Sequence, residues 1–516
     1  MDKKETGVAA ALFALLALAV YGFYVAHGGI YADDWAHLST FRFADSPRFW
    51  SSFDHFQEVL GGRPLFALML PIPQALFGGD AAAHLALAAG LAALASTCFY
   101  GLLRTLGMAP VHAGAVAALA LLFPWSDSVR LWPTGSLIGI SVCFFLLGLT
   151  IALRGLSRPG REGVAIHAAA DALFVLSILT YESAAAAALL AGALYLGRAP
   201  RAVAVRRWAA DVAVVLATLA YSLATTSGAR PVAGPLDRVA EIPSFVREGA
   251  VIAASALEPF GSIGRPVQAL VLLAAAAIVA IALLRLRREP DRQLREWLRW
   301  LAIGFVAVVC AYFMFLGSSL GPLDPGIDNR INVFAGFGFC LFAYALIACA
   351  CRLACPSERS ATGATLGLTL LLAAGYLVRV ADDQGDWRDA AEGQQAVLTA
   401  MGGQPWPPAR AVLGFGAPSQ SAPGVPVFGK SWDLTGAVRN ELDDPRLRAY
   451  PVYEGVQVRC RRYGLVVSGA GDYGSARLGY EQLYFLDVPT TRRLRIAGSA
   501  ACTRGLDRFA PGPLEG

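Results

Sequence analysis

Charged residues are scarce in this sequence. They make up only 16% of its 516 residues, whereas hydrophobic residues make up 56% and the mean hydropathy is +0.51. These values exclude an ordinary soluble globular protein. The first apolar run, residues 7–26, is also not followed by a small-residue cleavage site, so we expect a retained anchor. The pattern indicates a protein that crosses the membrane many times.

Cysteine pairs with metal-ligand spacing are missing as well. Seven of the nine cysteines lie in or beside apolar runs, where packing is their expected role. Cys460 and Cys502 stand apart in the polar tail, and we expect them to form a disulfide. The net charge of +5 predicts no nucleic-acid partner, because most basic residues fall in short loops between apolar runs, as the positive-inside rule requires.

Apolar runs of near-bilayer length predict eleven spans. With this count every basic loop falls on one side, which is then cytoplasmic and holds the N-terminus. Residues 64–78 are short and contain two prolines, so we expect a helix lying in the membrane interface there. The predicted spans are residues 7–26, 81–103, 110–124, 137–153, 164–180, 183–197, 209–227, 267–284, 300–317, 332–351 and 363–380.

Two domains are expected. Residues 1–380 predict a transmembrane domain whose first external segment is 27–80, and residues 228–266 are expected to form another external loop. Residues 381–516 combine helical stretches, Pro/Gly-rich turns and short β-type runs, which predicts a small external, periplasmic α/β domain. The expected fold class is therefore a membrane all-α bundle with external interfacial helices and an added α/β domain, located in the cell (inner) membrane.

The first external segment concentrates carboxylates, histidines, arginines and aromatic residues. At its centre are Asp33 and Asp34, seven residues after the first span. They could simply cap the helix that follows, since Asp is favoured at an N-cap and in the first turn. One acid suffices for a cap, however, so we favour a catalytic role for the pair. Adjacent helical residues point about 100° apart, so only one of the two is expected to face a cavity.

Three motifs together resemble the GT-C superfamily of membrane glycosyltransferases, of the protein-mannosyl, lipid-A arabinosyl and O-antigen glucosyl type. They are Tyr31-Ala-Asp-Asp-Trp-Ala-His37, Gly62-Arg-Pro-Leu65 and Thr180-Tyr-Glu-Ser183. The resemblance implies a GT-C-like bundle and a polyprenyl-phosphate-linked sugar donor. It also implies an envelope lipid, glycan or protein acceptor, contact with membrane lipids, and inversion at the anomeric carbon.

The resemblance also assigns roles within the first motif. Asp33 is implied to be the general base, with Asp34 or His37 orienting it. Protein-mannosyl relatives have Asp-Glu with a histidine three residues after the Asp. Here the second acid is Asp34 and His37 lies four residues after Asp33, which leaves the acceptor open.

The proposed chemistry needs few groups. A polyprenyl phosphate leaves as a stable anion, so one carboxylate base and one cationic clamp would suffice. Guanidinium groups match phosphate in two-point geometry. Each arginine could instead bind lipid headgroups or a helix end, and Glu182 could instead fix a helical hairpin by a local pair. The candidate substrate-binding residues are His37, Arg63, Arg130, Glu182, Arg265 and Arg330.

No cofactor is expected. His27, His37 and His55 could suggest a divalent metal together with the aspartates, but their spacing matches no compact ligand pattern. Residues 424–431 match the P-loop pattern letter for letter, yet Ala-Pro-Ser-Gln-Ser-Ala-Pro precedes them and Val-Pro-Val-Phe fills the loop. We therefore expect no nucleotide site there.

Two other functions stay open. An O-antigen-type polymerase or ligase is also a many-span enzyme with large external loops, and it would rely on loop arginines rather than on Asp33. A transporter or flippase would place acids and helix breaks near mid-membrane, whereas the strong charges here gather at one face and the spans show no internal repeat.

Overall fold

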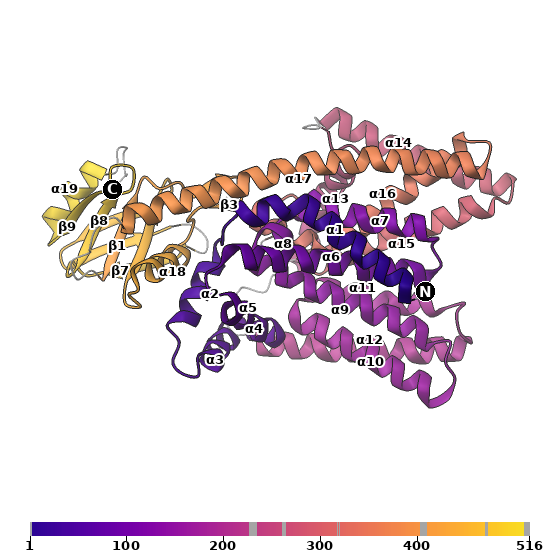
Figure 1. The fold of residues 1–516 in the computed structure, drawn as a ribbon, viewed down its shortest axis with the longest axis horizontal. Helices are drawn as coiled ribbons and strands as arrows, with labels where there is room; N and C mark the ends of the chain where they lie inside the picture. The colour runs from indigo at the N-terminus through magenta and orange to yellow at the C-terminus, as the bar shows by residue number, and fades with distance from the viewer. Residues whose placement is uncertain are drawn as a thin grey trace. The chain divides into compact units, whose positions relative to one another are not determined.

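The computed structural model describes residues 3–226, 235–260, 265–316, 318, 320–402, 410–469 and 473–509. Helices make up most of the described chain as far as residue 402, and the first named strand begins at Ala411 (Figure 1). The chain divides into two compact units. The first comprises Met1–Phe23, Phe56–Leu68 and Ala86–Asp383, and the second comprises Tyr24–His55, Met69–Leu85 and Gln384–Gly516.

Nine helices of the described residues are long and apolar enough to cross a membrane. Each coincides with a span predicted from the sequence, which supports a multi-pass membrane protein. They are α1 (Lys3–His27), α6 (Ala81–Leu106), α9 (Pro133–Gly155), α10 (Gly160–Thr180), α12 (Arg201–Thr225), α14 (Arg265–Arg288), α15 (Arg292–Phe313), α16 (Asn332–Ala354) and α17 (Glu358–Gly402).

The other two predicted spans are shorter in the structure. α7 (Pro110–Leu122) has 13 residues, which cover about 20 Å of a hydrocarbon core ~30 Å thick. Pro124 ends it, because proline lacks an amide donor and holds the preceding Phe123 in an extended conformation. Residues 182–195 are divided among η2 (Glu182–Ala184), α11 (Ala185–Leu190) and η3 (Ala191–Tyr195). These two segments are therefore shorter than the predicted spans, and their crossing of the membrane stays a prediction.

The predicted loop 228–266 also needs correction, because α13 (Pro235–Leu257) lies within it. Five charged residues interrupt its apolar pattern and hide it from a search for spans, although most of its residues are compatible with a helix. The predicted interfacial helix 64–78 consists of α4 (Pro64–Met69) and α5 (Pro71–Phe77), and a proline opens each of them. The remaining short helices are α2 (Asp33–Arg42), α3 (Arg48–Leu60), η1 (Pro124–Ser126), α8 (Ser128–Leu131) and η4 (Gly326–Ile331).

The second unit contains the predicted α/β region. Its largest sheet has the order β4-β1-β8-β9, with β1 parallel to β4 and β8, and β9 antiparallel to β8. All five residues of β1 are buried, as expected for the continuous apolar run of a central parallel strand. These strands are β1 (Ala411–Phe415), β4 (Arg448–Val452), β8 (Leu483–Asp487) and β9 (Arg492–Ile496).

Smaller elements complete this unit. An antiparallel sheet has the order β5-β6-β7, and a short hairpin joins β2 to β3. The structure forms the predicted disulfide between Cys460 on β5 and Cys502 on α19, with a Cα–Cα distance of 6.0 Å. The elements are β2 (Gln420–Ala422), β3 (Val425–Pro426), α18 (Ser431–Leu442), β5 (Gln457–Arg461), β6 (Gly464–Ser468), β7 (Ser475–Leu478) and α19 (Ser499–Phe509).

Candidate functional site

The two adjacent acids occupy the first two positions of α2. Ala32 precedes them with a positive φ of 47°, which turns the chain sharply into the helix. Asp34 Oδ2 accepts a hydrogen bond from the backbone amide of Tyr31 at 2.8 Å, and Asp34 is only 2% exposed. Asp34 therefore stabilises the turn that starts α2, where a negative charge also suits the helix dipole.

Asp33 has a different environment from its neighbour. It is partly exposed, and its Oδ1 accepts a hydrogen bond from the indole Nε1 of Trp432 at 2.9 Å. Trp432 lies near the start of α18, 399 positions away in the chain. Of the acid pair, Asp33 is thus the carboxylate that keeps surface for a reacting partner.

Tyr31 anchors the segment before α2. Its side chain is fully buried, and its hydroxyl donates to the backbone carbonyl of Trp387 on α17 at 2.8 Å. The same hydroxyl accepts from the amide of Gly29 at 2.8 Å and lies 3.0 Å from the Tyr24 hydroxyl. Burial raises the pKa of Tyr31 to about 12, so this hydroxyl keeps its proton at neutral pH. These hydrogen bonds therefore hold the chain in place just before the acid pair.

α18 packs directly against α2. A Cβ added at Gly436 would lie 2.4 Å from the backbone oxygen of Trp35, so only glycine permits this approach. Arg42 Nη1 donates to the carbonyl of Asn440 at 2.7 Å, and Trp35 Nε1 donates to Gln394 Oε1 at 3.2 Å. Elements from residue 384 onward therefore form one side of the Asp33 site.

His37 lies one helical turn after Asp33. Burial lowers its pKa and the neighbouring His55 acts in the same direction, whereas the charge of Asp33 acts to raise it. The ring is consequently neutral at neutral pH, with one nitrogen able to donate and the other able to accept.

The P-loop-like segment, residues 424–431, leads into α18, whose second residue is Trp432. The buried Asp433 carboxylate accepts hydrogen bonds from the amides of Gly429 and Lys430, both at 3.2 Å, and from Leu434 at 2.6 Å. These amides therefore point at a side chain of the protein. The Lys430 ammonium lies 4.8 Å from the centre of the Trp432 ring.

Arg63 and Glu182 meet in the first unit. Arg63 Nε donates to Glu182 Oε2 at 2.9 Å, and a second guanidinium nitrogen binds the other carboxylate oxygen. The guanidinium also lies 4.3 Å from the centre of the Tyr181 ring. Burial opposes the charge on Arg63, but Glu182 outweighs it and raises the Arg63 pKa. Glu182 is thus paired with Arg63, 119 positions away, and not within its own helical hairpin. A substrate role for either residue stays a prediction.

The other candidate arginines have different surroundings. Arg130 is 7% exposed and donates to the carbonyls of Phe123 and Ala120, both at 2.7 Å, so it binds the end of α7. Arg330 on η4 donates to Asp328 Oδ1 at 2.6 Å and is 21% exposed. The side chain of Arg265 lies outside the described residues. Phosphate binding by these arginines stays a prediction.

Sequence reasoning missed two groups of polar residues. Nothing in the sequence pattern around Trp432 indicates its bond to Asp33. His167, Asp171 and Asp211 form a close cluster in the first unit. The spacing of His167 and Asp171, four positions apart within an apolar run, was the available signal.

Taken by themselves, the two units are a membrane-type helical bundle and a unit with a small α/β fold. No family model matches the chain, and no curated protein sequence matches it. Among solved structures it is similar to the archaeal oligosaccharyltransferase AglB from Archaeoglobus fulgidus, in complex with an inhibitory peptide and a dolichol-phosphate. The identity is 11% and the TM-score 0.41, over 86% of this chain but only 64% of AglB, less than two thirds of its length.

A second similar protein is ArnT from Cupriavidus metallidurans. The identity is 16% for both of its structures. With ArnT bound to undecaprenyl phosphate the TM-score is 0.39, over 86% of each chain. With the apo state it is 0.34, over 86% of this chain and 85% of ArnT. All three TM-scores lie below 0.5, so assignments at the site rest on this chain's own residues.

Proposed function

We propose that the protein is an integral membrane glycosyltransferase. It moves a sugar from a polyprenyl-phosphate carrier to an envelope lipid, glycan or protein acceptor, as the sequence resemblance implies. One observation carries the proposal: a partly exposed carboxylate, Asp33, is held by an indole N–H at the start of α2, shortly after the first candidate span. A carboxylate that only capped α2 would not need the hydrogen bond from the Trp432 indole.

In the proposed step, Asp33 takes the proton from the acceptor hydroxyl. The acceptor oxygen forms a bond to the anomeric carbon while the bond from that carbon to the phosphate oxygen breaks. The polyprenyl phosphate leaves with the electron pair, and attack opposite the leaving group inverts the anomeric carbon. The Trp432 N–H bond to Oδ1 restricts rotation of the carboxylate, which is the positioning that proton transfer requires.

We propose two arginines, rather than one, as candidates for binding the carrier phosphate. We favour Arg63 for its place in a Gly-Gly-Arg-Pro turn and Arg330 for its place in Asp328-Asn329-Arg330 at the entrance of a span. A stable phosphate leaving group and a carboxylate base suffice for the step, so the proposal includes no metal or cofactor. The basic loops imply a cytoplasmic N-terminus and an external, periplasmic C-terminal region.

A deletion strain tests the function. Its envelope glycans and lipid-linked sugars are profiled by mass spectrometry, and its polymer lengths are read from gels. The expected result is loss of one sugar decoration with unchanged polymer length, restored by the parental gene but not by one carrying Asp33→Asn. Loss of polymerisation would favour the polymerase or ligase alternative, and an unchanged profile would contradict a transferase.

A further inference from the structure

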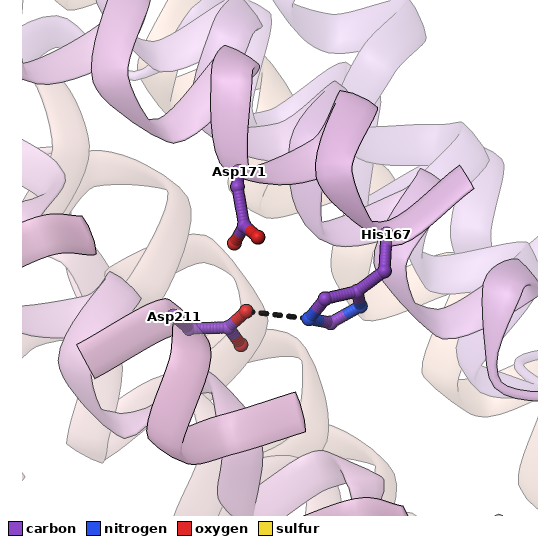
Figure 2. Close-up of side chains that lie close together, drawn as sticks. All are labelled: His167, Asp171 and Asp211. Atoms are coloured by element: carbon purple, nitrogen blue, oxygen red, sulfur yellow. Dashed lines mark hydrogen bonds and ion pairs between the residues drawn. The ribbon is translucent and has the colours of Figure 1, made fainter. Parts of the chain in front are cut away.

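A second cluster of ionisable side chains lies inside the first unit, between two candidate spans. His167 Nε2 lies 2.6 Å from Asp211 Oδ1, and the Tyr195 hydroxyl donates to Asp211 Oδ2 at 2.6 Å. Figure 2 shows the Asp171 carboxylate pointing toward Asp211 from the same helix as His167. One ligand atom from each of His167, Asp171 and Asp211 lies within 4.8 Å of the others.

Helix geometry brings these residues together. His167 and Asp171 are four residues apart on α10 and share one face, which α12 covers with Asp211. Close packing brings η3 and its Tyr195 against α12, since a Cβ added at Gly192 would overlap the Trp208 ring of α12. The cluster therefore belongs to the packed interior of this unit.

The charges of the cluster are not balanced by its own members. His167 is 2% exposed and Asp211 is fully buried, and both lie in helices apolar enough to span a membrane. Two facing carboxylates in such a place are costly unless positive charge accompanies them. The cluster itself contains one imidazole to supply it, and the charge of Arg207 on α12 acts on Asp171 from outside the cluster.

Two buried polar atoms of the cluster lack hydrogen-bond partners, which also suggests a bound ligand. Asp171 Oδ1 is shielded from solvent and has no hydrogen-bond partner among the described residues, and the same holds for His167 Nδ1. Buried polar atoms are normally hydrogen-bonded, so the missing partners of these two atoms require an explanation. A bound cation would supply both the charge and a partner for Asp171 Oδ1, whereas His167 Nδ1 lies on the side of the ring away from the carboxylates (Figure 2).

We infer that His167, Asp171 and Asp211 bind a divalent cation of the zinc class. One imidazole nitrogen and two carboxylate oxygens are typical Zn²⁺ ligands, whereas Mg²⁺ and Ca²⁺ prefer oxygen-only sets with more ligands. Tetrahedral ligands at ~2.1 Å from zinc stand about 3.4 Å apart. The observed separations, from 2.6 Å to within 4.8 Å, bracket that value. Tyr195 would orient Asp211 from outside the ligand set.

The inferred ion links α10 to α12 and is independent of the proposed glycosyl transfer. The full chain, purified in detergent and stripped with a chelator, is titrated with Zn²⁺ against a competing indicator dye. The expected result is one Zn²⁺ per chain, and Co²⁺ in its place should give the visible absorbance of a four-coordinate site. Neither readout requires a variant.

Variants then assign the site. His167→Gln and Asp171→Asn should weaken Zn²⁺ binding by more than about tenfold, the scale on which metal sites respond even to loss of supporting groups. His112→Gln is the matched control, because His112 is a partly buried histidine of α7 whose ring binds the Tyr344 hydroxyl. It should bind Zn²⁺ like the parental chain. Absence of stoichiometric metal in the parental chain, or equal affinity in all variants, would overturn the inference.

Discussion

Asp33 and Asp34 are adjacent in the sequence, yet their carboxylates bind different groups. Asp34 accepts from the backbone of the turn before α2, and Asp33 accepts from the indole of Trp432. Because neighbouring helical residues point about 100° apart, one acid is turned inward and the other keeps exposed surface. Asp34 therefore has a structural role, and the proposed chemical role falls to Asp33.

Replacing each acid by its amide separates these roles. Asp33→Asn keeps the shape and an oxygen for the Trp432 bond but cannot take a proton, so we expect a transfer rate lower by ~10² to 10⁴ at normal expression. Asp34→Asn should cost at most about 1 kcal/mol of stability, with a smaller rate defect. Initial rates in membranes with matched protein amounts test both. Near-parental transfer by Asp33→Asn would exclude it as the base.

His37 predicts a pH dependence of stability. Burial, together with His55, lowers its pKa against the opposing charge of Asp33, so the folded protein takes up this proton less readily than the unfolded chain. Unfolded histidine titrates near 6.5, so stability is fully present above that value and is lost as the pH falls through it toward the folded pKa.

Thermal unfolding of the purified protein at pH 7.5 and pH 5.5 measures this effect. The parental chain should lose more of its melting temperature on acidification than His37→Asn does, because the variant has no imidazole to protonate. An equal loss in both proteins would show that other groups govern the acid response.

At the scale of elements, the packing of α18 against α2 brings Trp432 to Asp33. Gly436 allows the close approach, and Trp432 then reaches Asp33 from the first turn of α18. Residues beyond 384 thus complete the surroundings of an acid that follows the first candidate span.

Trp432→Phe keeps the ring and removes the N–H donor. Because the N–H restricts rotation of the Asp33 carboxylate, we expect its loss to lower kcat about tenfold with little change in KM. Trp35→Phe is the matched control, since its indole binds Gln394 and not Asp33. It should lower stability but leave kcat nearly unchanged. Equal effects of the two substitutions on kcat would assign Trp432 a packing role only.

The Arg63–Glu182 pair joins the chain before α4 to η2. Both side chains are about three-quarters buried, with exposed fractions of 27% and 25%, and the contact is bidentate. Arg63→Gln and Glu182→Gln should therefore be non-additive, with a coupling energy of roughly 1 to 3 kcal/mol in unfolding measurements. Additive losses would show that the two residues act separately.

At the scale of the whole molecule, the membrane topology depends on two short apolar segments, α7 and residues 182–195. Without α7 and residues 182–195 as crossing segments, the basic loops would fall on both sides of the membrane. We therefore expect both to cross, together with the nine long helices.

Reporter fusions at two points check this topology. A fusion after residue 158 should be active only with a cytoplasmic reporter, and a fusion after residue 400 only with a periplasmic one. Periplasmic activity after residue 158 would mean that α7 does not cross. Cytoplasmic activity after residue 400 would reverse the placement of the C-terminal region.

The sequence by itself determined the nine long helices, the presence of an α/β region and the cysteine pair. Burial of apolar residues in lipid is a sum of local contributions that a window of the sequence can measure. Cys460 and Cys502 could be paired because no other cysteine lies in the polar tail. Local rules were insufficient where a few residues altered the outcome, as Pro124 did for α7 and five charged residues did for α13.

Only the tertiary structure decided which acid is exposed and what surrounds it. Trp432 reaches Asp33 across 399 positions, Glu182 reaches Arg63 across 119, and Asp211 reaches His167 across 44. Such contacts depend on how helices pack, and packing depends on the shapes of many side chains together, as the close approach at Gly436 illustrates. Local sequence patterns contain no measure of that fit, so the partners of the charged residues became visible only in the folded chain.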